Sequence, residues 1–449
     1  MDTQSEKLPV KTKLIYGVGD VGNAIVNSAI QFFLLAFYTD GALIPAGLAS
    51  TALWVAKFWD AVNDPLFGWL SDRTTSRFGK RRVYMIFGAL PLAVSIALLW
   101  SVPRGLSNVG VFLWIAFTFM LFDTLWTLTN VPYYALTAEL TEDYDERSSL
   151  TAFRMVLGVP AYIVGAALTP FLVSFFPDKR TGYGVVGVIY GVLAAVVLWI
   201  AAAGIRERPR IAESKAEAPP LRTFLETFRN RPFVQLIVAF LLANVAFALI
   251  KTLLYYFLTY QLSMEDQVPV VMFLLLVFVA LFLFPWKKLA ERLNKGPAYA
   301  LGLVIGGLAM AVTFFLPHRP TFWVYPIAII AGIGFSAQWV FPWAMVPDVV
   351  EIDRLSTGEY RGGMYYGVWG LATKLSDALG LVAAGWALQL SGYVPNVEQT
   401  ARTLLGIRLF FGPIPMLFLA LTLPLLFWYP ITRATHARLL AQLEGREKD

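Results

Sequence analysis

Long apolar segments recur along this 449-residue chain, and each is long enough to cross the roughly 30 Å of hydrocarbon in a bilayer. Hydrophobic residues make up 57% of the sequence and charged residues 15%, whereas soluble domains carry about 45–50% and about 25%. A soluble protein could not bury such an excess. The pattern predicts an all-α membrane protein with twelve spans, near residues 14–39, 44–70, 83–102, 110–138, 150–175, 183–205, 233–261, 268–286, 297–316, 321–346, 363–391 and 405–430.

Basic residues alternate between the two ends of these spans. Runs of Lys and Arg follow spans 2, 6 and 8, at residues 73–82, 206–231 and 287–295, and the loops at the other end are poor in them. Because cytoplasmic loops hold the excess of Lys and Arg, both termini are predicted to lie in the cytoplasm, with the chain in the cell (inner) membrane. Residues 1–13 show no signal-peptide pattern, so the first span is expected to be retained.

The longest non-apolar break, Ala212–Pro220, divides the spans into two groups of six. A basic gap follows the second span of each group, which suggests two duplicated bundles with substrate held between them. The expected domains are an N-terminal bundle with a cation site (1–206), a cytoplasmic linker (207–232), a C-terminal bundle (233–430) and a cytoplasmic tail (431–449).

The second span carries charges at a depth where lipid-facing helices do not hold them. Lys57, Asp60 and Asp64 are spaced i, i+3, i+7 and point to one face of a helix. A charge at membrane depth costs about 2.5–3.5 kcal/mol on insertion scales, and two carboxylates one turn apart repel each other. The pattern predicts a site that binds a cation or a proton, which is typical of an ion-coupled transporter.

Composition excludes several other classes of function. The net charge of +6 lies in short loops, where it indicates topology and lipid contact rather than nucleic-acid binding. The chain has no cysteine, and its two histidines, His318 and His436, fall in a predicted loop and in the tail, so thiolate and histidine metal sites are not expected. Without a hydrolase constellation or a phosphate-binding Gly loop, neither an enzyme nor a cofactor is expected beyond a coupling ion.

Short motifs along the chain resemble those of a known family. A loop motif of the major facilitator superfamily is matched by Gly68–Arg73 with Gly79–Arg82. The resemblance narrows to the glycoside-pentoside-hexuronide:cation symporters, the melibiose permease-like group, through Tyr16–Asp20, Trp59–Pro65, Asn130–Tyr134 and Gly392–Asn396. It covers spans 1 to 12 and implies a twelve-helix major facilitator fold of two pseudo-symmetric six-helix bundles.

By this resemblance the cation-binding residues are Asp60, Asn63, Asp64 and Thr127, with Asp60 and Asp64 as the metal ligands. The chemistry agrees, because small hard cations take oxygen ligands from carboxylates, amides and hydroxyls. Paired carboxylates that share a proton would let Na⁺, Li⁺ and H⁺ compete at one site. The alternative is that the two aspartates only form salt bridges, with Lys57 and Lys374.

Substrate recognition departs from the melibiose permease pattern. A span 1 Lys-Asp pair there is matched by Asn23 and Ala24, a span 4 carboxylate by Asn130, and a span 4 Trp by Tyr134, so galactoside specificity is not expected. The residues predicted to bind substrate, through polar groups or an aromatic face under a sugar ring, are Asp20, Asn23, Trp126, Asn130, Tyr134, Arg154, Trp339 and Lys374. The two tryptophans are equally compatible with ordinary helix packing.

Further charges are expected to couple or gate the transport cycle, namely Lys57, Asp123, Lys374, Asp377, Asp72 and Arg73. Lys374 is predicted to reach Asp60 or Asp64, although Asp377 lies only three residues away. Arg154 holds either an acidic substrate or a carboxylate of span 1 or 4. Lys251, in the middle of span 7, either selects an anionic substrate, snorkels, or pairs with Asp348 or Glu351.

Together these features predict a secondary active transporter that symports a sugar (glycoside, pentoside or hexuronide) with Na⁺ or H⁺ by alternating access. One alternative keeps the fold and carries lysophospholipids or other amphipathic solutes with a cation. Another, of a different class, is a membrane sensor that does not transport. The expected partners are the small-molecule substrate, a monovalent cation and the lipid bilayer, and a monomer is expected.

Overall fold

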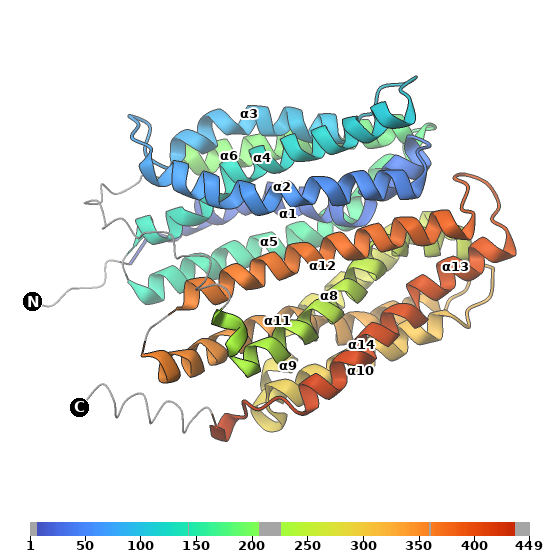
Figure 1. Ribbon diagram of the computed structural model, residues 1–449. Coiled ribbons are helices and arrows are strands. Elements are labelled where there is room, and N and C mark those ends of the chain that lie inside the picture. Colours follow the sequence, from blue (N-terminus) through green and yellow to red (C-terminus); the bar gives the residue numbers. More distant parts are fainter. Residues whose placement is uncertain (1–6, 142, 206–225, 359–360, 436–449) are drawn as a thin grey trace, which may run out of the picture. The chain divides into compact units, whose positions relative to one another are not determined.

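The computed structural model describes residues 7–141, 143–205, 226–358 and 361–435, and every regular element in these ranges is a helix. This confirms the predicted all-α architecture (Figure 1). The α-helices are α1 (Val10–Ala36), α2 (Ala46–Arg73), α3 (Arg82–Leu99), α4 (Asn108–Leu140), α5 (Tyr144–Val173), α6 (Lys179–Gly204), α8 (Arg231–Tyr256), α9 (Val268–Leu293), α10 (Lys295–Thr313), α11 (Val324–Thr357), α12 (Gly362–Ser391), α13 (Ala401–Phe411) and α14 (Pro413–Phe427).

Within the described residues, eleven helical segments are long and apolar enough to cross a membrane. The remaining predicted span, 44–70, corresponds to α2, whose 28 residues are long enough but include Lys57, Asp60 and Asp64. Its charges, and not its length, therefore set α2 apart from the other spans. Helices α13 and α14 together form the last of the eleven segments.

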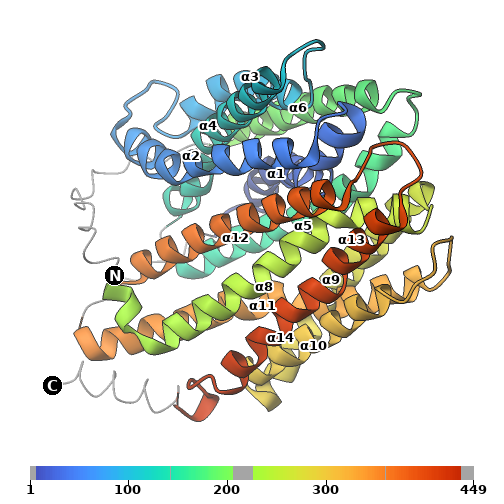
Figure 2. The same cartoon turned by 45° about the vertical axis from the view of Figure 1, so that its right-hand side comes forward.

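The chain divides into two compact units. Unit 1 comprises Met1–Ser214 and Val394–Val397, and unit 2 comprises Lys215–Tyr393 and Glu398–Asp449. In unit 1, α1 packs on α5 and α6, α3 packs on α6 and α4, and α2 packs on α4. In unit 2, α11 packs on α9 and α10, and α8 packs on α12 and α14. The helices of each unit run alongside one another in both views (Figures 1 and 2).

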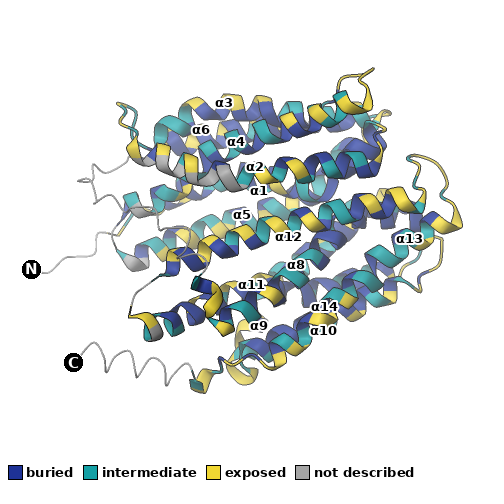
Figure 3. Ribbon diagram, viewed as in Figure 1, coloured by how far each residue is buried: buried dark blue, intermediate teal, exposed yellow. Residues whose placement is uncertain are grey.

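Exposed residues occur along the spans (Figure 3), and many of them have large apolar side chains. Phe87 on α3, Phe117 on α4 and Phe284 on α9 are all exposed. In water such a surface would drive aggregation, whereas in a bilayer the acyl chains cover it. Exposed apolar side chains are therefore expected in this protein. The polar side chains that are buried inside each unit are the ones that indicate where a functional site lies.

The first membrane-spanning helix described in each unit ends in the same unusual way. Helix α1 continues into the π-helical turn η1 (Phe37–Gly41), and α8 continues into the π-helical turn η3 (Phe257–Gln261). Two residues beyond each turn lies a residue with positive φ, Leu43 at 59° and Ser263 at 54°. A 2.9 Å backbone hydrogen bond closes each of these bends, from Ile44 N to Tyr38 O and from Met264 N to Leu258 O.

Several predicted boundaries differ from the structure, and two of these differences have a clear physical cause. Span 8 was expected to end at residue 286, but α9 continues to Leu293, so the basic residues from Lys287 to Arg292 are helical rather than in a loop. Polarity marks where a span leaves the hydrocarbon, and the helix itself can continue beyond that point. The last span, 405–430, is broken between Phe411 and Pro413, because proline has no N–H to donate to the preceding turn.

Candidate functional site

A buried polar contact joins α2 to α4. Asn63 Nδ2 donates to Asp123 Oδ2 at 3.1 Å, and both side chains are buried. Thr127, one turn beyond Asp123 on the same face of α4, is also buried. One turn before Asn63, Trp59 Nε1 donates to Thr124 Oγ1 at 2.8 Å. The Trp59–Asn63 face of α2 is thus fixed against α4 at two successive turns.

The side-chain amide oxygen of Asn63, Oδ1, accepts no hydrogen bond within the described residues, although it is fully buried. Leaving a buried acceptor without a donor costs roughly 1–3 kcal/mol, so this oxygen is poised to bind something from outside the protein. The Asn63 amide oxygen, the Asp123 carboxylate and the Thr127 hydroxyl are ligands that hard cations prefer. These residue types therefore fit a small cation.

Two more residues predicted for the cation site, Asp60 and Asp64, lie along α2 together with three of the predicted coupling or gating charges, Lys57, Asp72 and Arg73. Lys57 and Asp60 are half-buried, and Arg73 is exposed at the end of the helix. The side chains of Asp64 and Asp72 lie outside the described residues. Among the side chains that are described, no group of three or more His, Asp or Glu could hold a metal ion. The pairing of Asp60 with Asp64 at a cation stays a prediction.

A second cluster brings together Asp20 of α1, Tyr134 of α4 and Arg154 of α5. Tyr134 Oη donates to Asp20 Oδ1 at 3.2 Å, and Arg154 Cζ lies 4.7 Å from the centroid of the Tyr134 ring. Arg154 also interacts electrostatically with Asp20. Gly158, one turn beyond Arg154, leaves room for this carboxylate, because a Cβ there would lie 2.7 Å from Asp20 Oδ2. Of the two roles considered for Arg154, the structure shows an electrostatic interaction with the span 1 carboxylate Asp20, and binding of an acidic substrate stays a prediction.

The cluster is open on one side. Tyr134 is 41% exposed, and Asp20 and Arg154 are half-buried. Charged side chains within a membrane span face the bundle interior or a water-filled cavity, because contact with lipid is too costly. We therefore expect the open side of this cluster to face water rather than acyl chains.

Two predicted substrate ligands bond to each other. Asn23 Nδ2 of α1 donates to Asn130 Oδ1 of α4, and Asn130 Nδ2 donates to the backbone carbonyl of Trp126 at 3.0 Å. Both asparagines are buried, and Asn23 Oδ1 has no hydrogen-bond partner in the described structure. The hydrogen bond between the two asparagines thus joins α1 to α4. Trp126 lies 5.3 Å, centroid to centroid, from Phe122, so packing is at least one of its roles.

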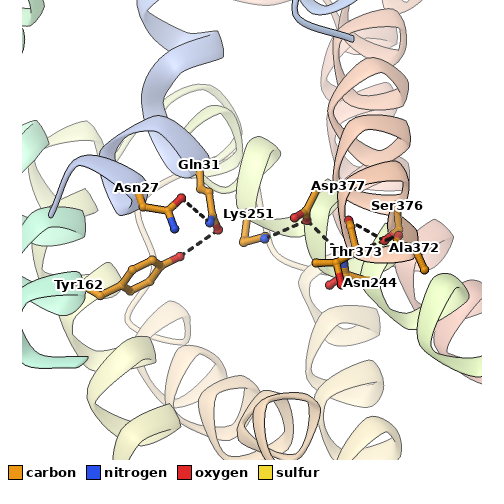
Figure 4. Close-up of polar contacts among 9 residues, drawn as sticks. All are labelled: Asn27, Gln31, Tyr162, Asn244, Lys251, Ala372, Thr373, Ser376 and Asp377. Atoms are coloured by element: carbon orange, nitrogen blue, oxygen red, sulfur yellow. Dashed lines mark hydrogen bonds and ion pairs between the residues drawn. The ribbon is translucent and has the colours of Figure 1, made fainter. Parts of the chain in front are cut away.

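Sequence reasoning missed a polar string that extends this site along α1. Tyr162 Oη of α5 donates to Gln31 Oε1 at 3.0 Å, and Gln31 Nε2 donates to Asn27 Oδ1 at 2.8 Å (Figure 4). The signal was present in the spacing. Asp20, Asn23, Asn27 and Gln31 lie at i, i+3, i+7 and i+11, which places them on one polar face of α1.

In unit 2, the charge in the middle of α8 has a partner on α12. Lys251 Nζ lies 3.3 Å from Asp377 Oδ1, and their side chains are 23% and 25% exposed. Asn244, two turns earlier on α8, donates to the same carboxylate at 3.2 Å and to Ser376 Oγ at 2.9 Å (Figure 4). Asp348, one of the partners considered for Lys251, instead pairs with Lys295 at 2.7 Å.

Two more predicted residues belong to unit 2. Trp339 of α11 is exposed, and Lys374 of α12 is half-buried one turn before Asp377. The predicted pairing of Lys374 with Asp60 or Asp64 would join the two units, and it stays a prediction.

Comparison with known proteins decides the family. The sequence profile of the MFS/sugar transport protein family matches residues 15–433. This chain belongs to that family. The match confirms the predicted membership in the melibiose permease-like group of the major facilitator superfamily, and it makes the chain a multi-pass membrane protein of a transporter family.

Relatives and solved structures agree with this assignment. An uncharacterized symporter of Synechocystis sp. is 31% identical, over 99% of this chain and 98% of its own. The sodium-dependent lysophosphatidylcholine symporter 1 of Gallus gallus is 28% identical, over 95% of this chain and 87% of its own. A crystal structure of the nucleoside transporter NupG superposes with a TM-score of 0.60 at 13% identity, over 97% of this chain and 98% of that one. At that identity the superposition shows the shared fold alone.

Proposed function

We propose that this protein is a secondary active transporter that couples the movement of a small solute to a monovalent cation, Na⁺, Li⁺ or H⁺. The observation that carries the proposal is the buried carbonyl oxygen of Asn63, which has no donor in the described structure and lies beside the Asp123 carboxylate. A cation would supply the missing partner of this oxygen. Membership in a transporter family supports the same conclusion.

Helix α4 supplies a physical route for coupling. Asp123, Thr127, Asn130 and Tyr134 are spaced i, i+4, i+7 and i+11 along it, so one face carries both the proposed cation ligands and part of the Asp20–Tyr134–Arg154 cluster. A cation that draws α4 toward α2 would therefore also position the solute side. Each ligand would tighten the binding of the other, because coupling free energies are reciprocal.

The solute that best suits the second cluster is a sugar. Asp20 and Arg154 offer an acceptor and donors for hydroxyl groups, and the exposed ring of Tyr134 offers an apolar face to a sugar ring. Trp339 and Lys374 are the residues we propose for the solute from unit 2.

A second candidate solute is a lysophospholipid. It is favoured by the likeness to the lysophosphatidylcholine symporter and by the loss of the sugar-binding carboxylates of melibiose permease, whose positions are matched here by Ala24 and Asn130. In this case Arg154 would contact the headgroup phosphate, since its guanidinium suits phosphate geometry.

Orientation and organisation complete the proposal. We propose that both termini lie in the cytoplasm and that the protein works as a monomer in the cell inner membrane. The distribution of Lys and Arg among the loops supports this orientation. In this proposal the ion gradient supplies the energy for transport. The protein is then a transporter, and not an enzyme or a sensor that only binds its ligand.

The test is the melting temperature of the purified protein in Na⁺, Li⁺, K⁺ and choline at constant ionic strength and across pH. A panel of glycosides, uronides and lysophospholipids is added to each condition. A ligand that binds only the folded state raises stability with its occupancy. We expect one cation to raise the melting temperature and one solute class to enlarge that rise. A rise that depends on solute but on neither cation nor pH would contradict coupling, and uptake into proteoliposomes then separates a carrier from a sensor.

A further inference from the structure

Unit 2 contains a cavity of about 630 Å³ that is separate from the residues of the proposed cation and solute sites. It lies where the end of α9 and the beginning of α10 meet α11 and the residues that follow α14. Its walls are apolar on one side and cationic on the other. None of its lining residues belongs to the proposed cation or solute sites, so that function leaves the cavity unexplained.

The apolar wall faces the membrane. Leu283 and Phe284 of α9 line it together with Val340 of α11 and Ile431. Phe284 is 77% exposed, and it lies within a helical segment long and apolar enough to span a bilayer, Glu265–Leu293. An exposed phenylalanine on such a segment contacts acyl chains. The cavity is therefore accessible from the hydrocarbon.

The other wall gathers positive charge at the end of the same span. Lys287, Lys295 and Arg433 line it, against the acidic residues Glu291 and Asp348. Lys295 Nζ is bonded to both oxygens of Asp348, at 2.8 and 2.7 Å, so these two charges neutralise each other. The two remaining cations, Lys287 and Arg433, are then opposed by the single carboxylate of Glu291, so the net charge of this wall is positive.

Hydrogen bonds to the backbone hold Arg433 at this wall. Helix α10 begins here, and its N-cap residue Asn294 forms no side-chain hydrogen bond to the helix. The Asn294 side-chain oxygen accepts instead from the backbone N–H of Arg433 at 3.0 Å. Arg433 Nη1 donates to the Glu291 carbonyl at 3.1 Å, which holds the guanidinium at the cavity. Helix α9 ends at Leu293, beside the start of α10, so the opposite partial charges of the two helix ends offset each other and the side chains set the charge of this wall.

We propose that this cavity binds an anionic phospholipid of the bilayer. Its headgroup phosphate would lie between Lys287 and Arg433 at the start of α10, and an acyl chain would lie along Leu283, Phe284 and Val340. Basic pockets between transmembrane helices at a membrane surface are suited to anionic headgroups. A zwitterionic headgroup fits less well, because its own ammonium group would face the two cations.

The test compares lipids and variants in the full-length purified protein. The melting temperature is measured in mixed micelles with dioleoyl phosphatidylglycerol, with dioleoyl phosphatidylcholine, and with glycerol 1-phosphate alone. We expect phosphatidylglycerol to raise it more than phosphatidylcholine does, and the soluble headgroup to have no effect. The double variant Lys287→Gln/Arg433→Gln should lose about half or more of the phosphatidylglycerol effect, since the shift follows affinity.

Two further variants separate the cavity from general surface charge. Lys288→Gln removes a neighbouring exposed lysine of α9 that does not line the cavity, and it should leave the lipid effect unchanged. Ala290→Leu narrows the cavity without changing charge, and it should weaken the effect. Equal shifts from both lipids, or an equal loss in Lys288→Gln and in the double variant, would overturn the proposal. So would a response to the soluble headgroup alone. Occupation of the cavity by the chain's own residues 436–449 would also overturn it, because the two lipids would then have equal effects.

Discussion

The two units hold carboxylates at membrane depth by different means. In unit 1, Asp123 accepts a hydrogen bond from the side-chain amide of Asn63, whereas Asp20 accepts one from the Tyr134 hydroxyl and also interacts electrostatically with Arg154. In unit 2, Asp377 is bonded to the ammonium group of Lys251 as well as to Asn244. The comparison is therefore between Asp123, which is bonded to an amide whose own oxygen has no donor in the described structure, and Asp377, which is paired with a lysine.

This difference indicates that the carboxylates of the two units have different tasks. A carboxylate beside Lys251 is already neutralised, so it needs nothing from solution and links α8 to α12 at all times. Neutral donors stabilise a carboxylate without cancelling its charge, and the free oxygen of Asn63 adds a ligand. An external cation is therefore expected to act on unit 1, and unit 2 is expected to respond to it only through coupling.

The largest effect is expected from removing the Asn63 amide. Asn63→Leu keeps a similar volume but deletes both the free oxygen and the donor to Asp123. Hydrogen bonds to charged groups are worth about 1.5–3 kcal/mol, and about 1.4 kcal/mol is tenfold in affinity, so the cation concentration for half-maximal uptake should rise about tenfold or more. Uptake into proteoliposomes across a cation titration measures it.

Thr129→Val is the matched control for that change. Thr129 is also buried on α4, but its hydroxyl bonds to carbonyls of its own helix, at Leu125 and Trp126. It should leave the cation dependence unchanged. If Asn63→Leu behaves like Thr129→Val, the neutral-donor site of unit 1 does not bind the coupling ion, and the contrast between the units fails.

A second change sharpens the contrast within unit 1. Tyr134→Phe keeps the ring over Arg154 but removes the hydroxyl that donates to Asp20. Solute affinity should fall about fivefold to tenfold, because one hydrogen bond to a charged group is lost, while cation affinity measured without solute stays the same. Tyr190→Phe, which removes a buried hydroxyl beside Thr169, is the control. Equal losses for solute and cation would mean that the two clusters form one site.

A third change tests whether the unit 2 ion pair is a structural link. Lys251→Met leaves Asp377 without its cation and should lower the free energy of unfolding by about 1–3 kcal/mol, between the values for exposed and fully buried pairs. Lys251→Met/Asp377→Leu should recover most of that loss, since an apolar pair can replace an ion pair. Thermal unfolding measures both. A lost cation response in the stable double variant would show that unit 2 also takes part in cation binding.

The smallest effect is expected from a carboxylate that lies outside both clusters at membrane depth. Asp178 caps α6, and hydrogen bonds from the Thr181 hydroxyl and from the backbone hold its pKa below the ordinary value. Its contribution is therefore present above the unfolded pKa of about 4, and it fades as the pH falls toward the lower folded pKa. Asp178→Ala should cost about 1 kcal/mol at neutral pH and less under acid conditions. Unfolding at pH 7 and pH 3 checks both the size and the sign.

Patterns within short stretches of the sequence predicted the features that depend on neighbouring residues in the chain. Apolar runs gave the spans, and the charges of α2 singled out the helix that carries Asn63. The extent of α9 was missed because hydropathy reports the edge of the hydrocarbon, whereas the helix continues through Lys287 to Leu293. The polar face of α1 was visible at Asp20 and Asn23, and the same spacing would have reached Asn27.

Pairings between distant segments could not be predicted in the same way. Lys251 and Asp377 are 126 residues apart. From the sequence, Asp348 and Glu351 were the partners considered for Lys251, and Asp377 was considered only for Lys374. Only the packing of α8 on α12 selects Asp377. The contact between Asn63 and Asp123 likewise depends on the rotation of α2 against α4, which hydropathy does not define.

The paired bends at the ends of α1 and α8 also bear on how this chain arose. π-Helical turns account for well below about 1% of residues, and they are formed by one extra residue inserted into an α-helix. Here the same turn, followed by the same left-handed residue, occurs at Phe37–Gly41 and at Phe257–Gln261. Two independent insertions at matching places would be a coincidence. A matched pair of bends is what the duplication predicted from the sequence would leave in the two bundles.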